Sequence, residues 1–202
     1  MLATTKTSLS IVSAALAVGV ALTGCSGAPD QVASLDTPGS VSLAAESLPA
    51  LPSPVLAVPS GNRLAFHFDA IGVQIYACQA TASGYGWVFQ APDATLYDDQ
   101  GNIKARHYAG PTWEYKDGSK VVAAKVAGFT ADPTAIPELL LKATSHSGDG
   151  RMSDVTYIQR LETVGGLAPT SGCDATQVGT AARVDYTATY YFYEADDSST
   201  ES

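Results

Sequence analysis

Residues 184–193 read Val-Asp-Tyr-Thr-Ala-Thr-Tyr-Tyr-Phe-Tyr, and this stretch decides the fold. In an extended strand, successive side chains point to opposite faces. One face would carry Val184, Tyr186, Ala188, Tyr190 and Phe192. The other face would carry Thr187, Thr189, Tyr191 and Tyr193. Both faces are rich in aromatic and β-branched residues, which favour strands and need neighbours to pack against. We therefore expect a central β-strand rather than an edge strand.

Shorter stretches of β-prone residues precede this strand at 63–69, 73–78, 85–89, 120–126 and 155–160. Turn-forming sequences separate them: Ser83-Gly84, Asp99-Gln-Gly101-Asn102, Asp117-Gly118, Gly148-Asp-Gly150 and Gly165-Gly166. Residues 136–145 fit either one helical turn after Pro137 or a buried strand. The pattern predicts an all-β fold, a single antiparallel sandwich or barrel-like domain with short loops and at most one short helix.

The aromatic residues mark the limits of the folded domain. All seventeen (2 Trp, 10 Tyr and 5 Phe) lie between Phe66 and Tyr193, which predicts a domain at 60–195. Residues 25–59 hold six of the eleven prolines and no aromatic residue, so we expect an extended tether there. The leucines that could pack its end on the domain are Leu43, Leu48 and Leu51. The polar, acidic residues 196–202 are expected to form a disordered tail.

The first 24 residues are predicted to be a lipoprotein signal peptide. Lys6 is the only charged residue before Asp30, and an apolar run of about 14 residues follows it, which is too short to span a bilayer. The run ends in Leu22-Thr23-Gly24-Cys25, which resembles a bacterial lipobox whose cysteine is lipidated and becomes the new N-terminus. The alternative is an ordinary secretory signal in which Cys25 is incidental. Ser26 follows the cysteine, and the resemblance to enterobacterial lipoproteins implies that the absence of Asp at this position favours the outer membrane of the bacterial cell envelope.

Charge and motif content exclude several classes of function. The 202-residue chain has a formal net charge of −9 and lacks a basic stripe, so we expect no nucleic-acid partner. The same lack of basic residues indicates that acyl chains, rather than anionic lipid headgroups, hold the protein at the membrane. The three histidines, His67, His107 and His146, lack metal-ligand spacing, so we predict no metal and no cofactor.

Cys78 and Cys173 remain once Cys25 is assigned to lipidation. In an oxidising compartment the two are expected to form a structural disulfide. The alternative is two separate buried thiols. A redox role is not expected, because the chain has no Cys-x-x-Cys motif.

Few residues are candidates for chemistry. His107 paired with Glu114 or Asp117 would provide a general base, because Gly110-Pro111 makes a turn that could set His107 opposite Glu114. The structural alternatives are a hydrogen-bonding histidine and an aspartate that caps its own hairpin turn.

Arg160, Trp113 and Trp87 are candidates for binding. Arg160 lies in a predicted strand and needs a carboxylate partner if it is buried, with Glu114 or Asp185 available, or else it binds a ligand. The tryptophans would either stack on sugars or belong to the core.

Several segments together resemble the DUF3455 domain family of uncharacterised secreted proteins from bacteria and fungi. They are Tyr76-Ala-Cys78, Trp87, the segment 107–114, Asp117-Gly-Ser119-Lys-Val, Tyr157-Ile-Gln-Arg160, Thr163-Val-Gly165-Gly166 with Pro169, Gly172-Cys173 and the segment 186–193. The chain departs from the family at Leu161-Glu162, where Val-Asn is usual, and it lacks a tryptophan near 136–138. The resemblance implies no established activity. Some fungal relatives carry a malate-dehydrogenase label, but this chain has no Gly-x-Gly-x-x-Gly motif to support it.

These observations predict an envelope-anchored lipoprotein whose domain is a non-enzymatic surface module that binds a glycan, a peptide or a partner protein. The absence of a catalytic signature and the length of the tether support this interpretation. The alternative is an extracytoplasmic hydrolase that uses His107 with Glu114 or Asp117, which requires these side chains to meet in one cleft.

Overall fold

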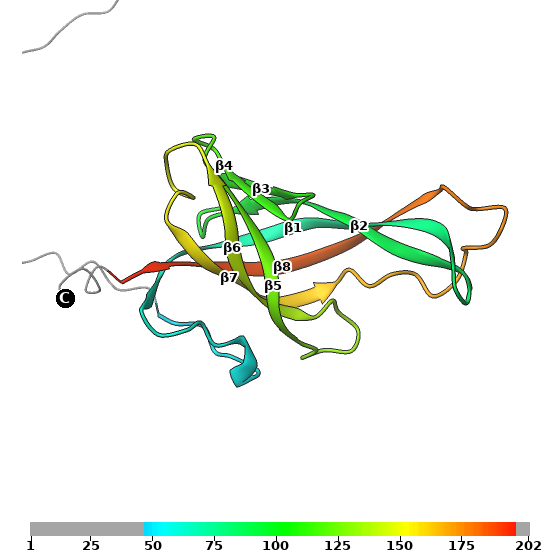
Figure 1. Cartoon of the computed structure of the whole chain (residues 1–202), viewed down its shortest axis with the longest axis horizontal. Helices are drawn as coiled ribbons and strands as arrows, with labels where there is room; N and C mark the ends of the chain where they lie inside the picture. The colour runs from blue at the N-terminus through cyan, green and yellow to red at the C-terminus, as the bar shows by residue number, and fades with distance from the viewer. Residues whose placement is uncertain (1–46, 197–202) are drawn as a thin grey trace, which may run out of the picture. The chain divides into compact units, whose positions relative to one another are not determined.

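The computed structural model describes residues 47–196 (Figure 1). The predicted signal peptide, Cys25, most of the tether and the end of the acidic tail lie outside these residues. Within the described part, no helix is long and apolar enough to cross a membrane.

Eight antiparallel strands form one closed barrel in which each strand pairs with its neighbour in sequence and β8 pairs with β1. The strands are β1 (Asn62–Thr81), β2 (Gly84–Tyr97), β3 (Ile103–Tyr108), β4 (Thr112–Tyr115), β5 (Lys120–Phe129), β6 (Glu138–Ser147), β7 (Val155–Gly165) and β8 (Ala181–Ala195). The only helical element of the described residues is the 3₁₀ turn η1 (Pro54–Leu56). The predicted all-β class is confirmed, and of the two architectures the structure has the barrel.

The stretch 184–193 is the centre of β8, which is paired along its length with β1 on one side and β7 on the other. The expectation of a central strand is confirmed. The two predicted stretches 63–69 and 73–78 form one 20-residue strand, β1. Residues 138–147 are strand β6, which settles the choice between a helical turn and a strand.

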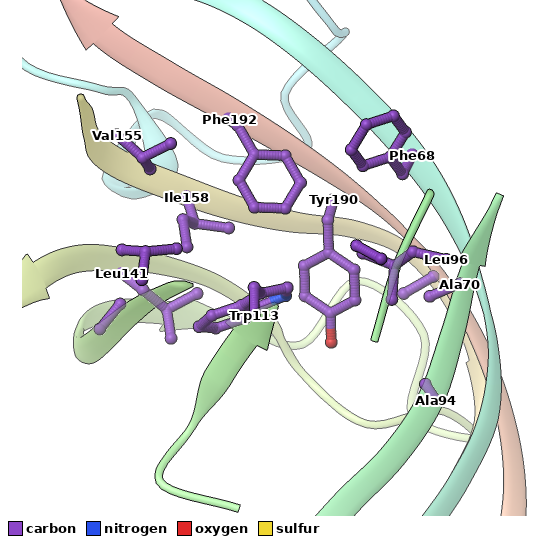
Figure 2. Close-up of a cluster of buried hydrophobic side chains, with 14 of the residues drawn as sticks. Phe68, Ala70, Ala94, Leu96, Trp113, Leu141, Val155, Ile158, Tyr190 and Phe192 are labelled. Atoms are coloured by element: carbon purple, nitrogen blue, oxygen red, sulfur yellow. The ribbon is translucent and has the colours of Figure 1, made fainter. Parts of the chain in front are cut away.

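The apolar face of β8 points into the barrel, as Figure 2 shows for Tyr190 and Phe192. Phe192 stacks on Phe66 of β1 with ring centroids 4.8 Å apart, and Trp113 of β4 packs edge-on against Tyr190 at 5.5 Å. These aromatic rings and the aliphatic side chains around them fill the part of the barrel beside the first half of β1. Burial of this surface stabilises the barrel by roughly 25 cal/mol per Å² of apolar area.

A second, smaller cluster lies on the outer side of the barrel, where η1 packs mainly against β5 and β6. Leu56 is fully buried there against Leu140 and Leu161. Its backbone oxygen accepts a 2.7 Å hydrogen bond from Nε2 of Gln159. Of the predicted contact residues, Leu48 and Leu51 are exposed and Leu43 lies outside the described residues. Leu56 therefore attaches the end of the predicted tether, a role that sequence reasoning assigned to other leucines.

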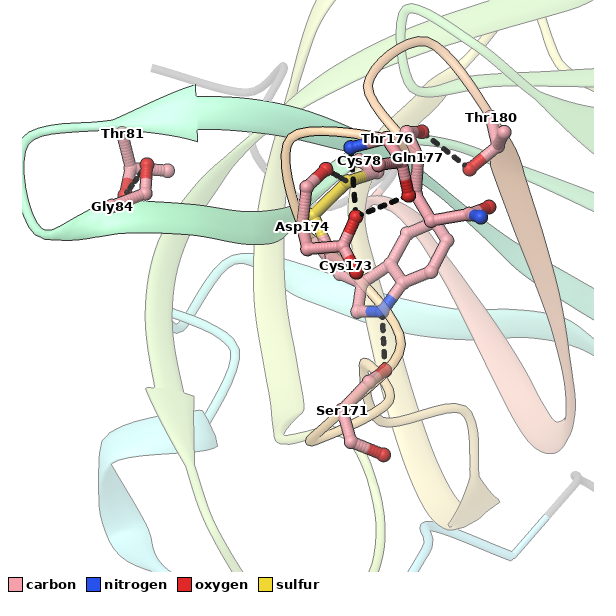
Figure 3. The surroundings of a disulfide bond; sticks show 10 residues. Cys78, Thr81, Gly84, Ser171, Cys173, Asp174, Thr176, Gln177 and Thr180 are labelled. Carbon is pink, nitrogen blue, oxygen red and sulfur yellow. Dashed lines mark hydrogen bonds between the residues drawn. A yellow bond between two sulfur atoms is a disulfide. The ribbon is translucent and has the colours of Figure 1, made fainter.

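Cys78 of β1 and Cys173 of the β7–β8 connection form a disulfide, as predicted (Figure 3). The bond holds the long connection against the end of β1. Backbone hydrogen bonds support it, because Cys78 donates to the Thr180 carbonyl at 2.9 Å and accepts from Gly179 at 2.9 Å. Trp87 of β2 adds a further link by donating its indole N–H to the Ser171 carbonyl at 2.8 Å.

Candidate functional site

A cavity of about 460 Å³ occupies the interior of the barrel beyond the aromatic core. All eight strands contribute to its wall, and Tyr190 and Trp113, which belong to the core shown in Figure 2, also line the cavity. Phe89, half of whose surface is exposed, and the exposed Lys125 line its outer part, so the cavity reaches the protein surface. Its volume lies in the range of about 300–1,000 Å³ that is usual for small-molecule sites.

His107 is buried in the wall of this cavity. Its Nδ1 donates to the Thr112 carbonyl oxygen at 2.9 Å, and its ring lies parallel to the Trp113 indole with 4.1 Å between centroids. Burial lowers the pKa of His107 to about 3, and the nearby charge of Arg160 also lowers it, against the Thr112 bond. The ring is therefore neutral at pH 7, with the proton on Nδ1, and Nε2 is an acceptor.

Glu114 does not meet His107. Pairing of β3 with β4 sets His107 opposite Trp113 and Arg106 opposite Glu114, and residues directly opposite each other share a face. His107 and Trp113 therefore point inward, whereas Glu114 points outward. The Glu114 carboxylate accepts from Tyr108 Oη at 2.8 Å and lies 3.4 Å from Lys120 Nζ, and these contacts lower its pKa. The catalytic pair of His107 with Glu114 is not formed.

Asp117 serves the β4–β5 turn. Its carboxylate accepts from the Ser119 amide at 2.8 Å, from Ser119 Oγ at 2.6 Å and from the Arg151 amide at 2.9 Å. These hydrogen bonds lower the pKa of Asp117. These contacts match the structural alternative, in which Asp117 caps its own hairpin turn. Asp117 does not line the cavity.

Arg160 of β7 points into the cavity, but neither expected carboxylate pairs with it. Its Nε and Nη2 donate to the Pro137 carbonyl at 3.2 and 2.6 Å. Among the described residues, no Asp or Glu forms an ion pair with this guanidinium, and Glu114 pairs with Lys120 instead. The predictions of Glu114 or Asp185 as its partner were wrong. The guanidinium donates instead to the backbone carbonyl of Pro137, the residue just before β6.

Two buried donors in the cavity wall lack a hydrogen-bond partner: Nε1 of Trp113 and Nε2 of Gln74. Both side chains are almost completely buried and both line the cavity. Unsatisfied buried donors are uncommon in native proteins and require a physical explanation. Gln74 was missed by sequence reasoning, because a single glutamine in a β-prone stretch carries no signal of its surroundings.

The binding candidate Trp87 lies elsewhere, with its indole engaged by Ser171. Trp113 does line the cavity, but His107 covers one face of its ring and only 1% of the residue is exposed, which leaves no exposed face for a sugar to stack on. In the described part of the chain, no cluster of three or more His, Cys, Asp or Glu side chains is placed to hold a metal ion.

Comparison with known families gives one match. The family model DUF3455, described as a protein of unknown function, matches residues 59–194. The chain belongs to the DUF3455 family. No curated protein and no solved structure matches the chain. The matched part of this DUF3455 domain extends from just before β1 to the penultimate residue of β8 and so includes the whole barrel.

Several motifs that carry the DUF3455 resemblance meet at the cavity. His107, Trp113, Arg160 and Tyr190 come from three separate segments of the sequence, and the barrel brings them into one wall. The arrangement can bind a small molecule through donors set in an apolar enclosure. It does not place an acid or base pair for catalysis, because the only titratable groups that line the cavity are His107, Lys125, Arg160 and Tyr190.

Proposed function

We propose that this DUF3455 protein is a non-enzymatic binding module of the bacterial cell envelope and that its ligand is a small molecule held in the barrel cavity. One observation carries the proposal: the Trp113 indole N–H is buried in the cavity wall without a protein acceptor among the described residues. An unpaired buried donor costs about 1–3 kcal/mol, and a ligand with an acceptor at this position would recover that cost.

The size and shape of the cavity favour a small molecule over the other expected ligands. A cavity of about 460 Å³ has no room for a folded partner, and a glycan would need an exposed aromatic face that Trp113 does not offer. The wall is largely apolar, with Phe89, Leu139 and Leu141 among its residues. Such an enclosure with a few polar groups is typical of small-molecule sites.

The proposal includes a lipid anchor at Cys25, which would keep the domain at the membrane. Cleavage before Cys25 would leave a proline-rich segment between the anchor and the barrel. That segment would hold the cavity away from the bilayer, at up to about 3.1 Å per residue where it adopts polyproline II. Acyl chains would supply the attachment, because the chain is acidic and has no basic patch.

A binding assay with a neutral, apolar fluorescent probe tests the cavity. The full-length chain is titrated with N-phenyl-1-naphthylamine, and we expect saturable binding of one molecule per chain. Ala123→Phe would fill the cavity from β5 and abolish binding, whereas the same change at the exposed Ala181, which does not line the cavity, would leave it intact.

Circular dichroism verifies that each variant is folded, and Leu139→Trp replaces Ala123→Phe if the latter does not fold. Absence of saturable binding, or equal binding by the wild type and a folded cavity-filled variant, would overturn the proposal.

A further inference from the structure

The polar groups of the cavity indicate the chemical class of its ligand. We propose that the ligand is a monocarboxylate with an apolar body, and that its carboxylate is held by Arg160, Trp113 and Gln74. This inference rests on the proposed binding function and narrows it to one class of small molecule.

The charge of the cavity wall is the first argument. The chain carries a formal net charge of −9, yet the lining includes Arg160 and Lys125 and no Asp or Glu. Arg160 lies in this wall opposite Leu139, its partner across the β6–β7 pair. Lys125 is exposed where the cavity reaches the surface. An acidic protein thus presents only positive formal charge to whatever occupies this cavity.

The unfilled hydrogen-bonding capacity is the second argument. A guanidinium has five N–H donors. Arg160 directs Nε and Nη2 to the Pro137 carbonyl and also hydrogen-bonds the Tyr190 hydroxyl, and among the described residues it has no carboxylate partner. Trp113 Nε1 can only donate, and no protein group among the described residues accepts from it. The Gln74 amide adds a third donor on β1. A carboxylate accepts about four hydrogen bonds and matches such a donor set.

The nearest acidic side chain does not substitute for a ligand. Glu138 is the only buried carboxylate close to Arg160 in the described chain, and its Oε1 accepts from the Glu162 amide at 2.9 Å. Burial raises the pKa of Glu138 and the charge of Arg160 acts to lower it, but the two side chains form no ion pair. Glu138 does not line the cavity. A cation within a low-dielectric enclosure is strongly favoured by an opposite charge, and here the ligand would supply it.

The remaining lining residues indicate that the body of the ligand is apolar. Leu139 and Leu141 of β6, Phe89 and Pro92 of β2 and Val122 of β5 present apolar surface to the cavity. A short alkyl chain or a single aromatic system would bury its surface there. A phosphate ester or a sugar acid would place further polar groups against these side chains and would bind less well, because polar groups without partners are costly to bury.

A matched pair of ligands separates the charge from the apolar body. Calorimetric titration of the full-length chain with octanoate and with octan-1-ol, at pH 7.5, should give about 10-fold or greater preference for octanoate. Arg160→Met should remove this preference while leaving octan-1-ol binding unchanged, because methionine keeps the apolar stem and loses the charge. Arg106→Met is the matched control, since Arg106 lies on the outward face of β3, and it should keep the preference.

The outcomes distinguish this inference from the proposed function. Equal affinity of the wild type for octanoate and octan-1-ol would overturn the carboxylate inference and leave small-molecule binding standing. A preference that survives in folded Arg160→Met would overturn the role of Arg160. Binding of neither ligand, together with no binding of N-phenyl-1-naphthylamine, would overturn both proposals. If Arg160→Met does not fold, the wild-type preference and its retention in Arg160→Lys decide the question.

Discussion

The imidazole of His107 lies flat against the indole of Trp113, with ring centroids 4.1 Å apart and planes inclined by 11°. The two residues are direct partners across the β3–β4 pair and both point into the barrel. Tyr190 packs edge-on against both rings, at 5.2 Å from His107 and 5.5 Å from Trp113. This three-ring group forms the boundary between the aromatic core and the cavity, and it keeps the histidine out of water.

Stability should depend on pH through His107. Burial lowers the pKa of His107 to about 3 in the folded chain, whereas an unfolded histidine titrates near 6.5. Between these values only the unfolded chain takes up the proton, so the free energy of unfolding decreases as the pH falls from about 6.5 towards 3. The slope reaches about 1.4 kcal/mol per pH unit only below pH 6.5. The free energy of unfolding therefore decreases by about 2 kcal/mol between pH 7.5 and pH 5. Urea unfolding at pH 7.5 and at pH 5 measures this change in the free energy of unfolding.

His107→Phe is the control for this prediction, because phenylalanine keeps a flat ring beside Trp113 and does not titrate. The variant should lose stability at both pH values but show a pH dependence smaller by about 2 kcal/mol over the same interval. An unchanged pH dependence would mean that His107 is accessible to protons in the folded protein.

Removing the disulfide should destabilise the barrel. The Cys78–Cys173 bond closes a loop with a sequence separation of 95 residues, for which the chain-entropy model gives about 4.7 kcal/mol. We expect Cys78→Ala combined with Cys173→Ala to lower the free energy of unfolding by up to that amount. Peptide mapping without reduction should link the two cysteines in the wild type. Free thiols at both positions would contradict the assignment.

Leu56 should be as important for stability as a residue of the barrel core. It is fully buried against Leu140 and Leu161, so Leu56→Ala should cost about 2–5 kcal/mol. Its neighbour Val55 has half of its surface exposed, and Val55→Ala should cost much less. Chemical denaturation of the two variants compares them. Equal, small losses would show that η1 is not held against the barrel in solution.

Glu162→Asn should stabilise the protein. Glu162 is the only described residue other than glycine with a positive φ, 54°, a conformation that asparagine tolerates better than glutamate. The substitution also removes a negative charge that raises the pKa of the buried Glu138. We expect a gain of about 0.5–1 kcal/mol. Glu162→Gln removes the charge alone, and a thermal melt that ranks it above Glu162→Asn would contradict the backbone argument.

Cys25→Ala tests the lipid anchor. If Cys25 carries acyl chains, the substitution should move the protein from the membrane fraction to the soluble fraction of the producing bacterium. Fractionation followed by immunoblotting measures the change. The disulfide cysteines are unaffected, so the released protein should melt at the temperature of the wild-type domain. Unchanged fractionation would contradict lipidation at this position.

The period-two pattern was sufficient to predict the class of the fold and the central place of residues 184–193. The period-two pattern did not mark β3 and β4, because strands of six and four residues with charged outward positions resemble a polar loop, and only the Gly110-Pro111 turn indicated a hairpin there. It also misplaced the partner of His107. The Tyr108–Thr112 pairing leaves three residues in the turn, and a register that differs by one residue moves a side chain to the other face.

The candidate site was predictable only in part, because it also depends on the register of strand pairing. His107, Trp113 and Arg160 stood out because of their chemistry, but what each contacts depends on pairings between strands that are distant in sequence. Gln74 illustrates the limit, since its position inside the barrel follows from the register of β1 with β8 and with β2. The partner of Arg160 is a backbone carbonyl, and no pattern of side chains predicts such a partner.

The pairing of β1 with β8 affects how the barrel is made. Asn62 pairs with Ala195, so the ring is completed only after nearly the whole domain has been synthesised, and pairings of such long sequence separation form slowly. Until then β1 and β7 each present an open edge to other chains. The disulfide shortens this search, because Cys173 lies eight residues before the start of β8 and is fixed to β1 close to Ala77, the partner of Ala181. Once the disulfide has formed, β8 needs only to pair with β1 from Ala181 onwards to close the barrel. An oxidising environment would thereby protect the newly synthesised domain from aggregation.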